Sequence, residues 1–302
     1  MRKNHKNSPN RNTDSSIYKV EEPIELLPFL IKMMTKSSRN SVKSVLTRGQ
    51  VTVDGKMIKQ HNHPLQIGQT VAILKNQAAM KEDALVGIEI LYEDDVLIAV
   101  NKDAGILSVA AKNEEEMTAY RQIKQYVKKE NLKNRVFVVH RLDRDTSGVM
   151  LFAKSEDIKK KLQEAWNEVV KERTYTALVE GVVRKKEGTI SSWLKESKTF
   201  KVHSNPTDNG GQHAITHYKT LQSNKQFTLL QVQLETGRKN QIRVHMEELG
   251  HPVVGDKKYG STINPIKRLG LHATALALVH PTTGELIRFQ ADAPKNFISK
   301  TK

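Results

Sequence analysis

The chain has 302 residues, with 49 lysines and arginines against 33 aspartates and glutamates, so its formal net charge is +16. It contains no cysteine, which excludes disulfides, thiolate catalysis, iron–sulfur clusters and cysteine-based zinc sites. No apolar run approaches the roughly 18 residues of a membrane span, so we expect a soluble, cytoplasmic protein whose leading partner class is nucleic acid.

The first 80 residues are strongly basic. Residues 1–22 are rich in asparagine, serine and basic side chains, and we interpret them as a disordered basic tail. Apolar residues at helical spacing predict a first helix over 24–34, and a second helix after residue 38 carries Arg39 and Lys43 on one face. Residues 51–53 alternate like a short strand before an Asp-Gly turn.

Short matches in this region resemble the S4 RNA-binding domain. They comprise Leu27-Pro28-Phe29-Leu30, Ser38-Arg39, Val42-Lys43, the Gly49 turn, Val51-x-Val53-Asp54-Gly55, Pro64-Leu65 and Gly68-Gln69. The resemblance implies a small S4-like RNA-binding domain over 23–78, in which Arg39 and Lys43, four residues apart, straddle backbone phosphates. The alternative is a solvated basic face with no RNA contact. We expect residues 79–88 to be a linker.

Strand-like patterns become frequent beyond residue 88. They occur at 96–100, 136–139, 149–153, 174–179 and 227–234, and helical patterns lie between some of them at 116–130, 156–171 and 238–249. This mixture predicts an α+β domain over residues 89–302 that is built mainly on an antiparallel sheet.

Residues 139–148 carry side chains of the types that catalysis needs. The tetrapeptide Asp-Thr-Ser-Gly at 145–148 resembles an aspartic protease loop, but no second copy is present to share a proton. His140, Asp143 and Asp145 could hold a divalent metal, although the two interleaved arginines would repel a cation. The third possibility is one carboxylate that neighbouring arginines keep ionised, because such a carboxylate is a competent covalent nucleophile.

The third possibility agrees with a family resemblance. The segment His140-Arg141-Leu142-Asp143-x-x-Thr146-Ser147-Gly148 is similar to the signature of the RluA/RluD-type RNA pseudouridine synthases. Further segments of that family follow in the expected order, at 172–181 around Tyr175, at 234–245 around Arg243, and at 249–260, 271–273 and 280–281. The resemblance therefore implies a pseudouridine synthase catalytic domain.

The resemblance also implies a pocket for a flipped-out uridine. In this pocket Asp143 is the catalytic nucleophile, Tyr175 stacks on the uracil, and Arg243 pairs with Asp143. Arg141 helps to hold the target nucleotide outside its stack, and Arg238 supports a phosphate or the pocket wall. Apolar walls would shield the intermediate from water, and we expect them at Leu142, Ile242 and Val244.

The reaction implied by the family converts specific uridines of structured RNA, in particular of large-subunit (23S) rRNA, to their C-glycoside isomer. No cofactor and no metal are expected, and a monomer is expected. The alternative function is a catalytically inactive RNA-binding or chaperone protein, which the intact set of Asp143, Tyr175 and Arg243 disfavours. Three alternatives stay open. Asp143 could form only a structural salt bridge, Tyr175 could occupy an ordinary core position, and Arg141 could contact only a phosphate.

Two positions depart from the family pattern. Asn240 stands where the family usually has histidine, and Asp103 replaces the proline of Asn-Lys-Pro-x-Gly, which restores a backbone N–H. Both bear on the choice of substrate more than on the reaction class. Three histidines nearby are expected to be structural hydrogen-bonding groups rather than metal ligands, namely His245, His272 and His280.

Overall fold

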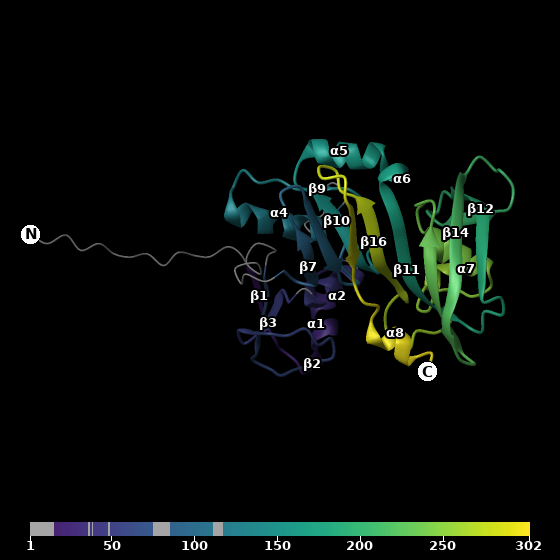
Figure 1. The fold of residues 1–302 in the computed structure, drawn as a ribbon. Coiled ribbons are helices and arrows are strands. Elements are labelled where there is room, and N and C mark those ends of the chain that lie inside the picture. The colour runs from purple at the N-terminus through teal and green to yellow at the C-terminus, as the bar shows by residue number, and fades with distance from the viewer. Residues whose placement is uncertain (1–14, 36, 38, 48, 75–84, 111–116) are drawn as a thin grey trace, which may run out of the picture. The chain divides into compact units, whose positions relative to one another are not determined.

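The structure is a computed structural model (Figure 1) that describes residues 15–35, 37, 39–47, 49–74, 85–110 and 117–302. These residues form two compact units that separate between Val86 and Gly87, apart from Met117, which is grouped with the first unit. Most of the expected tail and residues 79–84 of the expected linker lie outside the described residues.

The first unit combines two helices with short antiparallel strands. Its elements are β1 (Ser15–Lys19), β2 (Ile24–Glu25), α1 (Leu26–Met33), α2 (Arg39–Thr47), β3 (Val51–Val53), β4 (Lys56–Met57), β5 (Pro64–Leu65) and β6 (Thr70–Leu74). The strands form a sheet in the order β1-β6-β3-β4 and a separate β2–β5 pair. Apolar residues of both helices and of the strands make one core, including Leu26, Leu30, Val42, Leu46, Val51 and Val71.

Strand β1 differs from the expectation of a disordered tail over 1–22. All five of its residues pair with β6, Tyr18 packs against the core of this unit and Val20 is buried. The polar composition of the tail gave no signal for this strand, because its apolar anchors are only Tyr18 and the adjacent Val20, while Ile17 is 65% exposed.

The second unit is built on one large, mainly antiparallel sheet. Its first elements are β7 (Ile88–Glu93), β8 (Leu97–Lys102), α4 (Ala119–Glu130), β9 (Phe137–Val138), β10 (Ser147–Ala153), α5 (Glu156–Glu164), α6 (Trp166–Val169) and β11 (Val170–Glu180). Then follow β12 (Glu187–Glu196), β13 (Val202–Asn205), β14 (Gln212–Ser223), β15 (Phe227–Leu234), α7 (Gln241–Glu248), η1 (Lys257–Tyr259), β16 (Leu271–Val279), β17 (Leu286–Gln290) and α8 (Lys295–Ser299).

The strand order in this sheet is β13-β12-β14-β15-β11-β16-β10-β8-β7, with β17 on β16 and β9 on β10. Among the described strands, β10 and β16 are the one parallel pair. Helix α5 packs on β10, and α7 packs on β13 and β14 (Figure 1). The mixed, mainly antiparallel α+β architecture is the one predicted. No helix in the described part of the chain is long and apolar enough to cross a membrane.

Strand β10 lies in the centre of the sheet and is buried on both faces, which explains the run of apolar residues in its sequence. All of its residues are buried, because alternate side chains such as Leu151 and Ala153 enter the core beneath α5 while Met150 and Phe152 are buried on the other face. The predicted helix over 156–171 is broken at Ala165, and the chain enters β11 at Val170.

Candidate active site

A pocket opens in the second unit where the loop before β10 meets β11 and the start of α7. It is open to solvent, and seven of the eight pocket residues predicted from sequence line it. The twelve lining residues are Arg141, Leu142, Asp143, Thr146, Tyr175, Leu234, Arg238, Asn240, Gln241, Ile242, Arg243 and Leu271. The topology therefore brings together side chains that are as much as 130 residues apart in sequence.

The eighth residue, Val244, is a correction. Its side chain belongs to a different apolar cluster, with Leu194, Val202, Ala214 and Tyr259. The geometry of the helix explains the difference, because Ile242 and Val244 lie two residues, or about half a turn, apart and therefore on different faces of α7.

The backbone of the loop that carries Asp143 is fixed on both sides of that residue. The Ser108 hydroxyl donates to the carbonyl of Leu142 (2.7 Å) and accepts from the Leu142 N–H (3.1 Å). The carbonyl of Arg144 accepts from the N–H of Gly105 (2.9 Å) and from the Lys102 ammonium (3.1 Å). Asp143 is thus presented to the pocket by a loop whose polar groups have definite partners.

Lys102 lies beneath this loop and is fully buried. Its Nζ donates to three carbonyl oxygens, those of Asp103 (3.0 Å), Ile106 (2.8 Å) and Arg144 (3.1 Å). Burial lowers the pKa of Lys102 to about 7, although the charge of Asp145 acts against this shift. The sequence reasoning assigned Lys102 no role, and a lysine two residues after the apolar run Leu-Ile-Ala-Val is the signal that was available.

Asp143 and its neighbour Asp145 occupy different environments. The Asp143 side chain is 39% exposed and accepts from Arg243 Nη1 at 3.1 Å, whereas Asp145 is exposed and does not line the pocket. The His140 ring accepts from the N–H of Leu151, and burial lowers its pKa to about 4. Among the described residues no three histidine, aspartate or glutamate side chains gather as metal ligands would.

Arg243 makes the predicted pair with Asp143, but its strongest partner is a residue that the sequence reasoning missed. Its Nε and Nη2 donate to the two carboxylate oxygens of Asp256 at 2.5 and 2.9 Å, while only Nη1 reaches Asp143. The side chains of Arg243 and Asp256 are 15% and 2% exposed. Burial acts to lower the pKa of Arg243, but Asp256 and Asp143 together raise it, so the guanidinium stays charged.

Asn240 connects Arg243 to a buried tyrosine. Its Oδ1 accepts from Arg243 Nη1 (3.0 Å), and its Nδ2 donates to the Tyr259 hydroxyl (3.0 Å). The backbone at Asn240 is left-handed, with φ of 57°, a conformation that asparagine tolerates better than most residues. The asparagine that stands here in place of histidine therefore holds Arg243 by a hydrogen bond and suits the left-handed backbone at the start of α7.

Asp103, the other position that departs from the family pattern, has a backbone N–H that proline would lack, and this N–H makes a hydrogen bond. Its backbone N–H donates to the carbonyl of Gly87 at 2.8 Å. Gly87 has a positive φ of 63° and lies so close to Ile106 that an added Cβ would meet Ile106 Cδ1 at 2.5 Å. This contact fixes the segment that also supplies Lys102.

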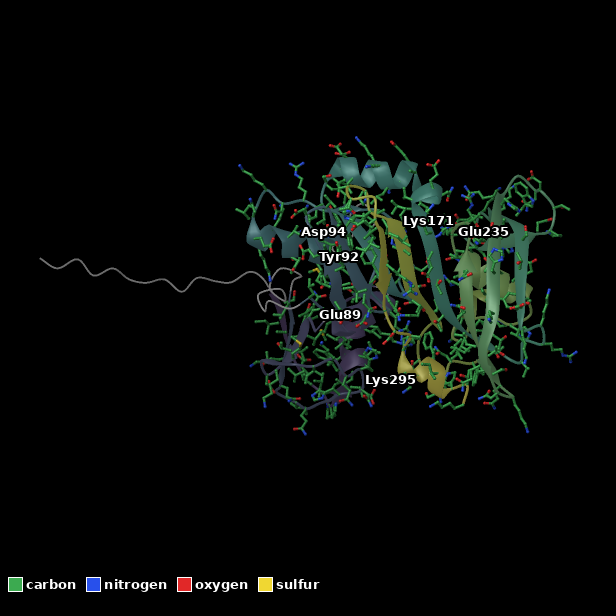
Figure 2. The ribbon with its side chains drawn as sticks, viewed as in Figure 1. Glu89, Tyr92, Asp94, Lys171, Glu235 and Lys295 are labelled. Carbon is green, nitrogen blue, oxygen red and sulfur yellow. The ribbon has the colours of Figure 1, made fainter. Side chains whose placement is uncertain are left out.

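Tyr175 lies on β11, and its half-buried ring lines the pocket. Burial raises the pKa of its hydroxyl to about 12 despite the charge of Arg173, so the phenol is neutral at physiological pH. Towards its start β11 carries Arg173 and Lys171, and Lys171 and Glu235 line a separate hollow at this end of the strand (Figure 2).

Gly148 shows why the signature ends in glycine. Strands β10 and β16 run parallel at this point, and a Cβ on Gly148 would lie 2.1 Å from the carbonyl oxygen of Ala273. Beside it the Ser147 hydroxyl contacts His272 Nδ1 (2.7 Å) and accepts from Arg268 (2.6 Å). The pairing of these strands sets the position of the loop that precedes them.

The remaining predicted residues are placed as follows. Arg141 and Arg238 are exposed at the pocket and Leu142 and Ile242 are buried in its wall. Arg39 is exposed and Lys43 half-buried on α2 of the first unit. The three histidines hydrogen-bond to structural partners. His245 contacts Ser192 and Thr216, His272 contacts Ser147 and the Ala291 carbonyl, and His280 contacts Asp94.

Comparison with known proteins agrees with the sequence signature. Residues 96–248 match the family model of RNA pseudouridylate synthases. The chain is 33% identical to YhcT of Bacillus subtilis, an uncharacterized RNA pseudouridine synthase, over 88% of each protein. It is 31% identical to ribosomal large subunit pseudouridine synthase D of Yersinia pestis, over 89% of this chain and 87% of that protein.

A solved structure gives the same fold. Human RNA pseudouridylate synthase domain containing 4 superposes with a TM-score of 0.58 at 24% identity, covering 69% of this chain and 90% of that one. The fold, the family model and relatives matched over most of their length confirm the family that residues 139–148 indicated, and this chain belongs to the RNA pseudouridine synthases, which are isomerases.

Proposed function

We propose that this enzyme isomerises specific uridines of large-subunit (23S) rRNA, with Asp143 as the covalent nucleophile. The observation that carries the proposal is the pairing at the pocket: Asp143 is partly exposed to the open space while it contacts the buried, doubly held guanidinium of Arg243. A relative named for the large ribosomal subunit, matched over most of both chains, supports the choice of RNA.

Arg243 acts by keeping Asp143 in one position. Asp256 and Asn240 fix the direction in which Arg243 Nη1 points, and Nη1 donates to Asp143 Oδ2 at 3.1 Å. The nucleophile then needs no reorientation when the substrate binds, which is how a prearranged site lowers an activation barrier.

Arg141 and Tyr175 act on the base before the chemistry begins. A uridine must leave its stack to enter the pocket, at a cost of a few kcal/mol. The exposed Arg141 is free to fill the space that the base leaves, and the neutral ring of Tyr175 offers a face for the uracil. Arg238, which is exposed and also lines the pocket, is the residue we assign to contact a phosphate of the target nucleotide.

The reaction is a rearrangement within one nucleoside. The N1–C1′ bond of uridine breaks, a C5–C1′ bond forms, C5 loses a proton and N1 gains one, so no group is oxidised or reduced. Asp143 forms a transient bond with the nucleoside and is released at the end. The buried side chains of Leu142 and Ile242 exclude water from the intermediate.

We further propose that residues 23–78 of the first unit form an S4-like RNA-binding domain that adds affinity. Its helix α2 presents Arg39 to solvent, and residues 24–80 contain eight basic and two acidic side chains. Such a surface attracts phosphates without reading sequence.

The test is pseudouridine mapping on rRNA. Unmodified large-subunit rRNA, made by transcription, is incubated with the protein, and a small-subunit transcript serves as the control. We expect pseudouridine at one or a few positions of the large-subunit RNA and none with D143N. Modification confined to the small-subunit RNA or to tRNA would contradict the proposed target, and full activity of D143N would contradict the proposed nucleophile.

A further inference from the structure

The turn between β12 and β13 places a phenylalanine where the backbone favours glycine. Ser197 N–H donates to the Lys201 carbonyl (2.8 Å) and Phe200 N–H donates to the Ser197 carbonyl (2.9 Å), which closes a short hairpin loop. Phe200 has a positive φ of 60°. Hairpin loops normally place glycine at such a position, and a bulky residue there is an outlier that costs stability.

The Phe200 side chain gains little burial in return for this strain. It is 70% exposed to solvent, so most of the apolar area that usually compensates for ordering a phenylalanine stays in water. An aromatic ring held out by a strained but well-bonded turn is the arrangement expected of a group that contacts a ligand.

The surroundings of the ring are basic. Lys239 Nζ lies 5.8 Å from the ring centroid, Lys258 Nζ donates to the Phe200 carbonyl at 2.7 Å, and Lys198 is exposed in the same turn. Lys201 completes four lysines, and among the described residues the ion pairs that these lysines make are those of Lys239 with Glu196 and of Lys201 with Glu247. An aromatic face among excess cations suits a nucleotide, whose base stacks while its phosphate meets a lysine.

The turn is bonded to the wall of the pocket. The buried Tyr259 hydroxyl accepts from the N–H of Val202, at the base of the turn, and from the side chain of Asn240, in the pocket wall. Lys239 stands in sequence between Arg238 and Asn240, which both line the pocket. A base on Phe200 would therefore be held in a fixed relation to the base inside the pocket.

We propose that Phe200 is a stacking site for an unpaired base of the substrate RNA, outside the pocket that holds the target uridine. This inference rests on the proposed function only in taking RNA as the ligand. It adds a contact to a neighbouring nucleotide, which would help to decide which uridines reach the pocket.

The test compares four variants on one unmodified large-subunit rRNA transcript. F200G removes the ring and leaves the residue that the positive φ favours, F200L keeps apolar bulk without an aromatic face, and F200Y keeps the face. L286A is the control, because Leu286 is 66% exposed on β17. Kd, KM and the single-turnover rate at saturating RNA are measured together with the melting temperature.

We expect F200G and F200L to raise Kd and KM by about 5- to 150-fold, the effect of losing one stacked base, while the single-turnover rate stays within about 3-fold of wild type. F200Y and L286A should bind like wild type, and F200G should melt no lower than F200L. Wild-type binding by F200G or F200L, or an equal loss in F200Y, would overturn the inference. If wild-type protein binds the transcript but forms no pseudouridine, the proposed function fails, and the comparison of Kd values still decides the role of Phe200.

Discussion

The two units of the molecule treat their charged side chains in opposite ways. In the second unit the two cations that support the Asp143 loop are largely withdrawn from water and bonded on several sides, Arg243 by Asp256, Asp143 and Asn240, and Lys102 by three carbonyls. In the first unit cations such as Lys19, Arg39, Lys56 and Lys59 are exposed.

This contrast separates two physical demands. A covalent step needs its groups in place to within a fraction of an ångström, and buried multiple hydrogen bonds provide that precision. Attraction to a polyanion needs only charge near a surface, and it is screened by salt. Changes in the second unit should therefore act on rate and stability, and changes in the first unit on affinity.

The largest effect should come from Asp143→Asn. The change keeps the volume of the side chain but removes the anionic nucleophile, so we expect pseudouridine formation to fall below about one part in a thousand of wild type, because losing a covalent nucleophile costs more than losing an acid–base helper. Single-turnover assays and a melting curve measure rate and folding together.

Asp145→Asn is the matched control for Asp143. The two carboxylates lie two residues apart on one loop, but Asp145 is exposed and outside the pocket. Its replacement should change the rate by less than about tenfold. Equal losses in the two variants would instead favour a paired-carboxylate or metal mechanism.

Asp256→Asn should be the next largest change, and here the effect is on stability. Removing the charge of Asp256 leaves Arg243 buried with a weakened partner, and breaking a buried ion pair costs about 3–5 kcal/mol. Urea unfolding measures this loss, and the single-turnover rate should fall as well because Arg243 Nη1 is no longer aimed at Asp143.

An exposed pair of the same geometry provides the comparison. Arg288 Nε and Nη2 donate to the two carboxylate oxygens of Glu172 at 2.7 and 3.2 Å, but the Arg288 side chain is 48% exposed. Glu172→Gln should therefore cost no more than about 1 kcal/mol. If Asp256→Asn and Glu172→Gln lowered the unfolding free energy by similar amounts, burial would not be what makes the Arg243–Asp256 pair strong.

Lys102 should make stability depend on pH. Its pKa is about 7 in the folded protein and near 10.5 when unfolded, so between these values the unfolded chain binds the additional proton and stability rises with pH. Relative to Lys102→Met, the unfolding free energy of wild type should rise by up to about 1.4 kcal/mol per pH unit, a gain that is lost as pH falls towards 7. A difference that stays constant from pH 7 to pH 10 would contradict the assignment.

The residues that share a local signature could be predicted from sequence, and those that act through tertiary contact could not. Asp143, Tyr175 and Arg243 stand in recognisable segments. Asp256 acts by reaching back thirteen residues to Arg243, and Lys102 by reaching a carbonyl 42 residues away. Neither relation leaves a periodic pattern in the sequence.

The fold shows the same limit. Strands with an apolar core face, such as β10 and β15, were predicted, whereas β12 and β14 were not. Their buried faces include Ser192 and Thr216, which hydrogen-bond to the two nitrogens of His245 at 3.0 and 2.8 Å. A strand whose buried side chains are polar lacks the apolar alternation on which sequence prediction depends.

The smallest effect on rate should come from the first unit, in the double variant Arg39→Gln with Lys43→Gln. If both side chains contact phosphate, the dependence of log affinity on log salt should become shallower by about 1.4 to 1.8, because each contact contributes about 0.7 to 0.9. Affinity for long structured RNA should fall at low salt, and the single-turnover rate at saturating RNA should stay near wild type, because the pocket residues lie in the other unit.

Replacing the exposed Lys56 and Lys59 by glutamine is the control, and it tests whether any two cations of this unit would have the same effect on affinity. An unchanged slope in the Arg39 and Lys43 variant would make that helix face merely solvated, and a collapsed rate would mean that the first unit shapes the pocket, which would end the division between precise placement and simple attraction.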